Sequence, residues 1–355
     1  MRGLKRNAAK RQDITLAKRT AGILAGLALF GWASGTVFPA TPSSTQARGW
    51  PAKDEITIAV MDSGLGGLSI MAAAAARLES AGLAERVNFV FFNALFDNES
   101  GYNSLPTREA KVRIFASALR SLASDFRPDI ILVGCNTLSV LLPDVPFART
   151  AGIAIIGIVD PGVDMIGSAL KADPGARLIL FGTETTIAEG THRKKLEEMG
   201  IDGGRIVSQA CPELAAAIEN GFKSENTALL IEAYVDEAMA KIGAPPRHLV
   251  AGLICTHYGY ALDLWTAAFA GKGVSRLTLL DPNDRLAEDL VPPGSGRRFV
   301  RTEIKARVVS MVEISARKRI SLAEGLASRS PEVAAALRDY ELRPDLFEWR
   351  ALASR

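Results

Sequence analysis

Short apolar runs alternate with segments of helical pattern from Ile56 onward, and this alternation restricts the fold more than any other feature of the sequence. Apolar runs of about four to eight residues are typical of buried strands. Strands that alternate with helices form a mainly parallel sheet, so we expect an α/β fold. The predicted helices include Leu68–Ser80 and Ala188–Met199. The predicted strands are Ile56–Val60, Val87–Phe92, Asp129–Gly134, Ile153–Ile158, Arg177–Phe181, His248–Ile254 and Arg276–Leu280.

Polar and thiol groups directly follow three of these strands. They are the segments Asp62-Ser63-Gly64-Leu65-Gly66-Gly67, Gly134-Cys135-Asn136-Thr137 and Cys255-Thr256-His257-Tyr258. Ligands bind at the carboxyl ends of strands in parallel sheets, so the sequence predicts a site there. The glycine-rich segment lacks the Lys-Ser/Thr pair of a phosphate-binding loop and is interpreted as a tight turn. We expect Asp62 and Ser63 to face the site from that turn. The alternative is that Asp62 is the N-cap of the following helix.

Two of the three cysteines, Cys135 and Cys255, occupy equivalent places between a strand and a helix. This repetition predicts two similar lobes with mainly parallel sheets and an active site in the cleft between them. A helix N-terminus can lower the pKa of a thiol toward neutrality, and the thiolate is then a usable base. A buried structural role is the alternative for each cysteine. No metal site is expected, because no C-x-x-C pair occurs and His257 is the only histidine near a cysteine.

The net charge of +3 is the sum of three regions with different charge. Residues 1–50 carry eight basic residues and the single acidic residue Asp13. Residues 51–290 carry 21 basic and 30 acidic residues, and residues 291–355 carry 13 basic and 8 acidic residues. An acidic body argues against nucleic-acid binding, which requires a basic surface.

The basic N-terminal region leads into an apolar stretch at residues 21–40. This pattern predicts a signal peptide or an N-terminal membrane anchor, followed by a linker, within residues 1–50. The protein would then be exported, periplasmic or anchored to the inner membrane. A disordered extension on a cytoplasmic protein is the alternative.

The expected domains follow from the predicted strands and from the change of charge near residue 291. We predict a first α/β lobe from residues 55–158 and 257–295, a second from 159–256, and a helical C-terminal extension over 296–355. The extension could pack on the body, on a second subunit of a homodimer, or on anionic lipid, and a solvated helical tail is the alternative.

Six motifs in order between Ile56 and Leu290 resemble those of the aspartate/glutamate racemase superfamily, glutamate racemase most closely. They read IAVMDSGLGGLSI, VGCNTLS, GIVDPGV, GTETTIAEGT, ACPELAAAIENG and GLICTHYGYAL. The resemblance implies an isomerase that racemises glutamate or aspartate without a cofactor, in the context of peptidoglycan biosynthesis for the cell wall. Asn93, Tyr102-Asn103 and Gly259 depart from the family pattern, in which an Asp, a Tyr-Gly pair and a Pro stand at these places.

The resemblance also implies roles for individual residues. Cys135 and Cys255 would be the catalytic thiols on opposite faces of the substrate α-carbon, supported by Asp62, His257 and Glu219. Cys211 is not a catalytic match. The implied substrate-binding residues are Asp62, Ser63, Asn136, Thr137, Thr256, His257, Tyr102 and Thr186.

Racemisation itself requires such a pair of groups. It removes a proton from one face of a carbon and returns one to the other, so two acid/base groups in opposite protonation states must flank that carbon. The open alternatives are a related isomerase or decarboxylase of a dicarboxylate, and an exported amino-acid binder without catalysis. Binding alone does not require either cysteine, which argues against the binder.

Overall fold

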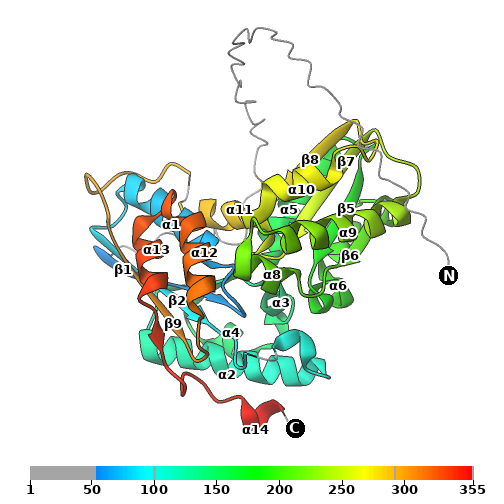
Figure 1. Ribbon diagram of the computed structural model, residues 1–355. Helices are drawn as coiled ribbons and strands as arrows, with labels where there is room; N and C mark the ends of the chain where they lie inside the picture. The colour runs from blue at the N-terminus through cyan, green and yellow to red at the C-terminus, as the bar shows by residue number, and fades with distance from the viewer. Residues whose placement is uncertain (1–52, 99–100, 292, 354–355) are drawn as a thin grey trace, which may run out of the picture. The chain divides into compact units, whose positions relative to one another are not determined.

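The computed structural model of the chain describes residues 53–98, 101–291 and 293–353 (Figure 1). All of them belong to the unit Ala40–Arg355. The predicted signal peptide or anchor at residues 1–50 lies outside the described residues. Within the described ranges, no helix combines the length and the apolar character needed to cross a membrane.

Ten strands of the described residues form two sheets in which every strand pair is parallel. The first sheet has the order β10-β9-β2-β1-β3-β4 and the second the order β6-β5-β7-β8. The bounds are β1 Glu55–Asp62, β2 Arg86–Asn93, β3 Ile130–Val133, β4 Ala154–Gly157, β5 Arg177–Gly182, β6 Ile206–Ala210, β7 His248–Ile254, β8 Arg276–Leu280, β9 Glu303–Ser310 and β10 Glu341–Leu342.

The two sheets repeat one topology. In β2-β1-β3-β4 of the first sheet and β6-β5-β7-β8 of the second, the strand that comes first in the chain lies between the second and the third, and the fourth lies beyond the third. Cys135 follows β3 and Cys255 follows β7, which is the third strand of each repeat. The predicted α/β fold with two similar lobes is confirmed, and the two thiols occupy equivalent positions in it.

Helices connect the strands, as parallel pairing requires. Gly190 has a φ of 64°, which favours glycine and interrupts the helix predicted over Ala188–Met199. The described helices are α1 Leu68–Ala81, η1 Tyr102–Ser104, α2 Arg108–Phe126, α3 Asn136–Ser139, η2 Leu142–Asp144, α4 Pro146–Thr150, α5 Val159–Ala172, α6 Glu184–Glu189, α7 Thr191–Glu198, η3 Gly203–Arg205, α8 Leu214–Gly221, α9 Glu225–Ile242, η4 Tyr258–Ala261, α10 Leu262–Phe269, α11 Pro282–Glu288, α12 Ala316–Ala327, α13 Pro331–Arg338 and α14 Arg350–Ala353.

Both faces of each sheet are covered, which explains why the strands are continuous apolar runs. In β1, Ala59 and Met61 pack in the core under α2, whereas Ile58 and Val60 pack under α1, α12 and α13. In the second sheet, helices α8, α9 and α10 cover one face, and α5 and α7 cover the other. The apolar residues of α5 belong to the same hydrophobic cluster as those of α2, so one of the three clusters spans both lobes.

The structure corrects the predicted domain boundaries. Strand β8 pairs with β7 in the second sheet, although residues 257–295 were assigned to the first lobe. From that range, α11 packs against α1 of the first lobe. Strand β6 was not predicted, because two of its five residues, Ser208 and Gln209, are polar.

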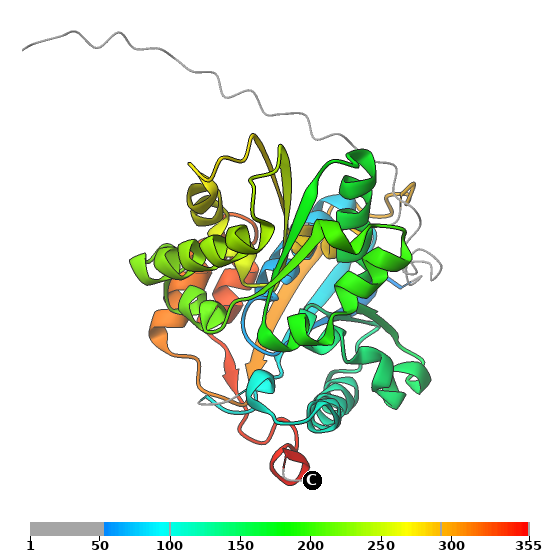
Figure 2. The ribbon, with the colours of Figure 1, turned by 90° about the vertical axis from the view of Figure 1, so that its right-hand side faces the viewer.

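The segment 296–355 is not wholly helical. Figure 2 shows β9 lying in the first sheet, and β9 pairs with β2 along its whole length. In β9, with the sequence EIKARVVS, the side chains of the first five residues are alternately exposed and half-buried, as expected for a strand. Its charged residues obscured this alternation, and the segment forms part of the first lobe.

Candidate active site

The first thiol is held between β1 and β3 of the first sheet. Cys135 Sγ lies 3.0 Å from the hydroxyl oxygen of Ser63, directly after β1. Burial, and then the Asp62 carboxylate, raise the pKa of the Cys135 thiol far above its usual range. The expectation of a lowered pKa is therefore wrong for Cys135. The helix that follows, α3, has only four residues, and the desolvation of a thiolate outweighs its dipole.

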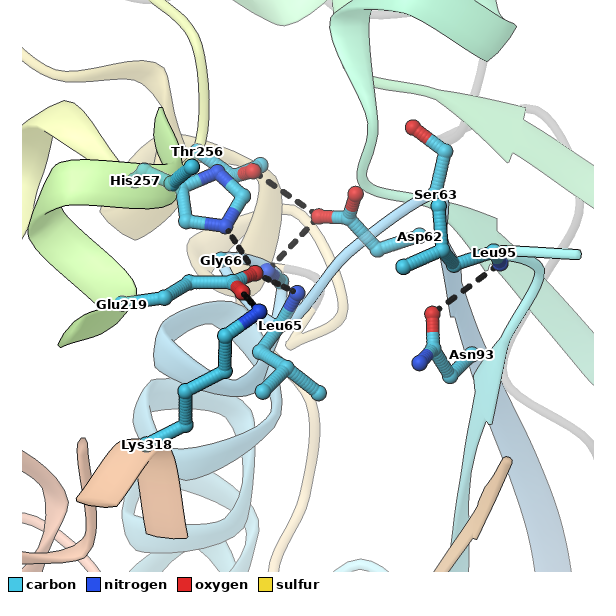
Figure 3. A network of polar contacts seen from close by, with 12 residues as sticks. Asp62, Ser63, Leu65, Gly66, Asn93, Leu95, Glu219, Thr256, His257 and Lys318 are labelled. Carbon is cyan, nitrogen blue, oxygen red and sulfur yellow. Dashed lines mark hydrogen bonds and ion pairs between the residues drawn. The ribbon is translucent and has the colours of Figure 1, made fainter. Parts of the chain in front are cut away.

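The second thiol belongs to a chain of buried polar groups. Cys255 Sγ lies 3.6 Å from Nδ1 of His257. Nε2 of His257 lies 2.8 Å from Oε1 of Glu219 on α8 (Figure 3). Burial by itself lowers the pKa of His257, but Cys255 and Glu219 together raise it well above its usual value. Burial raises the pKa of Glu219, yet His257 and Lys318 bring it down to about 2. A carboxylate and an imidazolium therefore stand behind the second thiol.

Asp62 connects the two sides of the site. Its Oδ2 accepts a hydrogen bond from the hydroxyl of Thr256 at 2.8 Å (Figure 3). The same oxygen accepts a second one from the backbone N–H of Gly67 at 2.7 Å. Asp62 thus holds the backbone N–H of Gly67, just before α1, and also contacts the second lobe. Gly67, not Asp62, is the N-cap of α1, so the predicted cap is wrong, and the contact of Asp62 with substrate stays a prediction. Burial raises the pKa of Asp62, against the opposing effects of His257 and Thr256.

The glycine-rich turn allows the two lobes to approach closely. The backbone N–H of Leu65 donates to Oε1 of Glu219 at 2.9 Å. A Cβ atom at Gly66 would lie 2.7 Å from the backbone nitrogen of His257 and would also overlap the hydroxyl of Thr256. The turn therefore serves the contact between lobes, which agrees with its interpretation as a tight turn rather than a phosphate-binding loop.

Asn136 and Thr137, at the start of α3, face residues that follow β5. Oδ1 of Asn136 lies 3.1 Å from Nε2 of His192, and among the described residues its Nδ2 has no partner although it is buried. The hydroxyl of Thr137 lies 2.9 Å from that of Thr183 and 3.5 Å from that of Thr186. This leaves an unused amide donor beside a cluster of hydroxyls.

Thr183 and His192 were not predicted as site residues. Thr183 follows β5 in the same way that Ser63 follows β1, so the repeated topology could have revealed it. His192 lies on α7 and is buried, and burial lowers its pKa to about 4. Nothing in the sequence pattern around His192 distinguishes it from a core histidine.

The predicted contact Tyr102 is buried in η1, against the ring of Phe96. Burial, and then Cys135, raise the pKa of its hydroxyl well above its usual value. Asn93 uses its amide inside the first lobe, because Nδ2 donates to Ser310 Oγ at 3.0 Å and Oδ1 accepts from the N–H of Leu95 at 3.1 Å.

The structure explains why glycine stands at position 259, where the family pattern has a proline. A side chain at Gly259 would overlap the carboxylate of Asp281, the half-buried N-cap of α11. Burial raises the pKa of Asp281 to about 7. Within the described residues, no group of three or more His, Cys, Asp or Glu side chains could hold a metal ion.

The fold and the site define a class of protein: a two-lobed α/β racemase with one thiol at the equivalent strand end of each lobe. The chain belongs to the Asp/Glu/Hydantoin racemase family, which matches residues 58–246, more than half of its length. It is an isomerase of the amino-acid racemase class. Cys255 and His257 lie beyond the matched residues.

Two curated relatives are glutamate racemases. The chain is 27% identical over 270 residues to glutamate racemase 3 of Caldanaerobacter subterraneus subsp. tengcongensis, covering 73% of this chain and 89% of the relative. It is 29% identical over 202 residues to glutamate racemase of Aquifex pyrophilus, covering 57% of this chain and 70% of the relative.

Solved structures show the same fold. The glutamate racemase isoform RacE1 of Bacillus anthracis superposes with a TM-score of 0.59 at 19% identity, over 82% of this chain and 99% of its own. The glutamate racemase of Francisella tularensis subsp. tularensis, in complex with D-glutamate, superposes with a TM-score of 0.56 at 18% identity. The superposition covers 82% of this chain and 98% of that structure. At these identities the likeness concerns the fold alone.

Proposed function

We propose that this protein racemises glutamate, or the shorter aspartate, with Cys135 and Cys255 as the two acid/base groups and without a cofactor. The observation that carries the proposal is the different environment of the two thiols. Cys135 has a strongly raised pKa and is protonated, whereas Cys255 faces the imidazolium of His257. Two-base racemisation starts from such a pair, one proton donor and one acceptor.

In the proposed reaction, the Cys255 thiolate takes the α-proton from one enantiomer, so that the Cα–H bond breaks and an S–H bond forms. The electron pair left on the α-carbon then accepts the proton of Cys135 from the opposite face. The other enantiomer reacts in the reverse sense. The free Nδ2 donor of Asn136 and the hydroxyl cluster around Thr137 would hold the substrate carboxylate, whose negative charge increases in the transition state.

Incubation in deuterated water tests the substrate and the reaction together. With reduced protein, we expect deuterium at the α-carbon of D- and L-glutamate or of D- and L-aspartate, and final mixtures with equal amounts of both enantiomers. Proton NMR and chiral chromatography measure the two results. Absence of exchange with both amino acids would refute the substrate proposal. New products in the NMR spectrum would favour the related isomerase or decarboxylase, and binding without turnover would favour a binder.

We further propose that residues 1–50 direct the protein out of the cytoplasm, as their basic and apolar pattern indicates. A phosphatase reporter that is active only after disulfide formation tests this in a bacterial host. The reporter fused after residue 50 should be active, and the reporter without residues 1–50 should be inactive. An inactive fusion would contradict export and would fit the predicted role in peptidoglycan biosynthesis.

A further inference from the structure

Lys318 on α12 contacts the buried carboxylate behind the second thiol. Its Nζ lies 2.8 Å from Oε2 of Glu219 (Figure 3). The other oxygen, Oε1, is held by His257 Nε2 at 2.8 Å and by the N–H of Leu65 at 2.9 Å. Each oxygen of Glu219 therefore has a partner, and the partner of Oε2 comes from the C-terminal segment, far outside the family match at 58–246.

We propose that the C-terminal segment completes the active site by supplying Lys318 as a positioning residue, whose ammonium orients Glu219 and thereby holds His257 against Cys255. This inference rests on the proposed function and extends it to a part of the chain beyond the family match. Lys318 contacts Glu219 rather than either thiol, so it acts through the carboxylate and the imidazole.

Packing on both sides of α12 keeps Lys318 in place. Leu322, Ala323 and Leu326 are fully buried in the core of the first lobe. On the side of the second lobe, Arg317 Nε donates to the carbonyl oxygen of Asn220 at 2.7 Å, directly after Glu219. The helix thus connects the first lobe to α8 of the second, and it delivers the lysine where both lobes meet.

The charge of Lys318 balances a buried cluster. Glu219 is only 6% exposed, and a buried carboxylate without a matching cation is costly. Removal of the ammonium would leave the Glu219 carboxylate with His257 as its single cationic partner, and the acidic groups of the cluster would then bind protons more readily. The ionisable groups of this cluster are Glu219, Asp62, Cys255, His257, Tyr260 and Lys318. Cys211 and Tyr258 face Cys255, and Cys135 faces Asp62.

Three substitutions in the full chain test the role of Lys318. Lys318→Met removes the charge and keeps most of the side chain, and Lys318→Arg restores the charge. Lys223→Met is the matched control, because Lys223 pairs with Glu324 of α12 at 4.0 Å, near the same helices, but both side chains are at least 70% exposed. The measurements are the pH dependence of kcat and the rate at which iodoacetamide alkylates each cysteine in the unliganded protein, followed by mass spectrometry.

For Lys318→Met, we expect kcat to fall roughly tenfold and the acidic limb of its pH profile to move up by about one unit, because the lost cation had favoured the deprotonated groups. The pH at which Cys255 becomes reactive should rise similarly, while the reactivity of Cys135 stays unchanged. Lys318→Arg and Lys223→Met should resemble the parent protein.

Two outcomes would overturn the inference. One is an unchanged ratio of Cys255 to Cys135 alkylation in Lys318→Met across the pH range. The other is an equal rise for all three thiols, which would mean that Lys318 stabilises the fold as a whole. Alkylation needs no substrate, so it tests the inference even if the parent protein fails to racemise glutamate and aspartate.

Discussion

Replacing either Cys135 or Cys255 by serine is expected to reduce racemisation on the order of 10³-fold. A serine hydroxyl keeps a similar size but does not ionise near neutral pH, so it cannot replace a thiolate base. In Cys135→Ser, Cys255 can still remove and return a proton on its own face, so this variant should exchange the α-proton of one enantiomer without inverting it. Cys255→Ser leaves only Cys135, whose raised pKa keeps it protonated, so this variant should exchange the opposite enantiomer far more slowly. Chiral chromatography and NMR in deuterated water measure both effects.

Cys211→Ser is the matched control for this pair. Cys211 is also buried, but it follows β6, the edge strand of the second sheet, and its thiol donates to the carbonyl oxygen of Gln209 at 3.7 Å. We expect this variant to retain activity within a few-fold of the parent protein. If Cys135→Ser or Cys255→Ser racemised as fast as Cys211→Ser, the two-thiol mechanism would be wrong.

Gly66→Ala is expected to lower racemisation about 100-fold, although it adds a single methyl group. The new Cβ would lie 2.7 Å from the backbone nitrogen of His257, and that nitrogen cannot rotate away as a flexible side chain would. Relief of the overlap requires the turn and the second lobe to separate. His257 and Thr256 would then move relative to Asp62, and the free energy of unfolding should fall by about 1–3 kcal/mol. Enzyme kinetics and thermal unfolding measure these changes.

Gly296→Ala is the control for that substitution, because a Cβ at Gly296 meets no atom within 4 Å and the residue has an ordinary φ. Its activity and stability should match those of the parent protein. Gly66→Ala with activity within threefold of the parent would show that the lobes do not need the close contact at the turn.

Much of the candidate site could be predicted because its residues follow strands. Ser63, Cys135, Thr137 and Thr256 stand one or a few positions after an apolar run, and the carboxyl ends of parallel strands are where sites form. Glu219 was a different case. It lies within α8, and only the resemblance of the ACPELAAAIENG segment to a family motif pointed to it.

The protonation of the thiols could not be predicted in the same way. A cysteine at the start of a helix suggests a lowered pKa, but the effect depends on how deeply the sulfur is buried and which charges face it. For Cys135 the burial and the neighbouring Asp62 decide the direction, and both are consequences of tertiary packing.

The sequence by itself determined the alternation of strands and helices, the place of both thiols at strand ends and the glycines of the turn, because these depend on local pattern and on residue type. Only the tertiary structure decided where the C-terminal segment belongs. The pairing of β9 with β2 is a contact between residues more than 200 positions apart, which no local pattern encodes. That pairing brings α12 over α8 and Lys318 to Glu219, since an ion pair depends on distance in space.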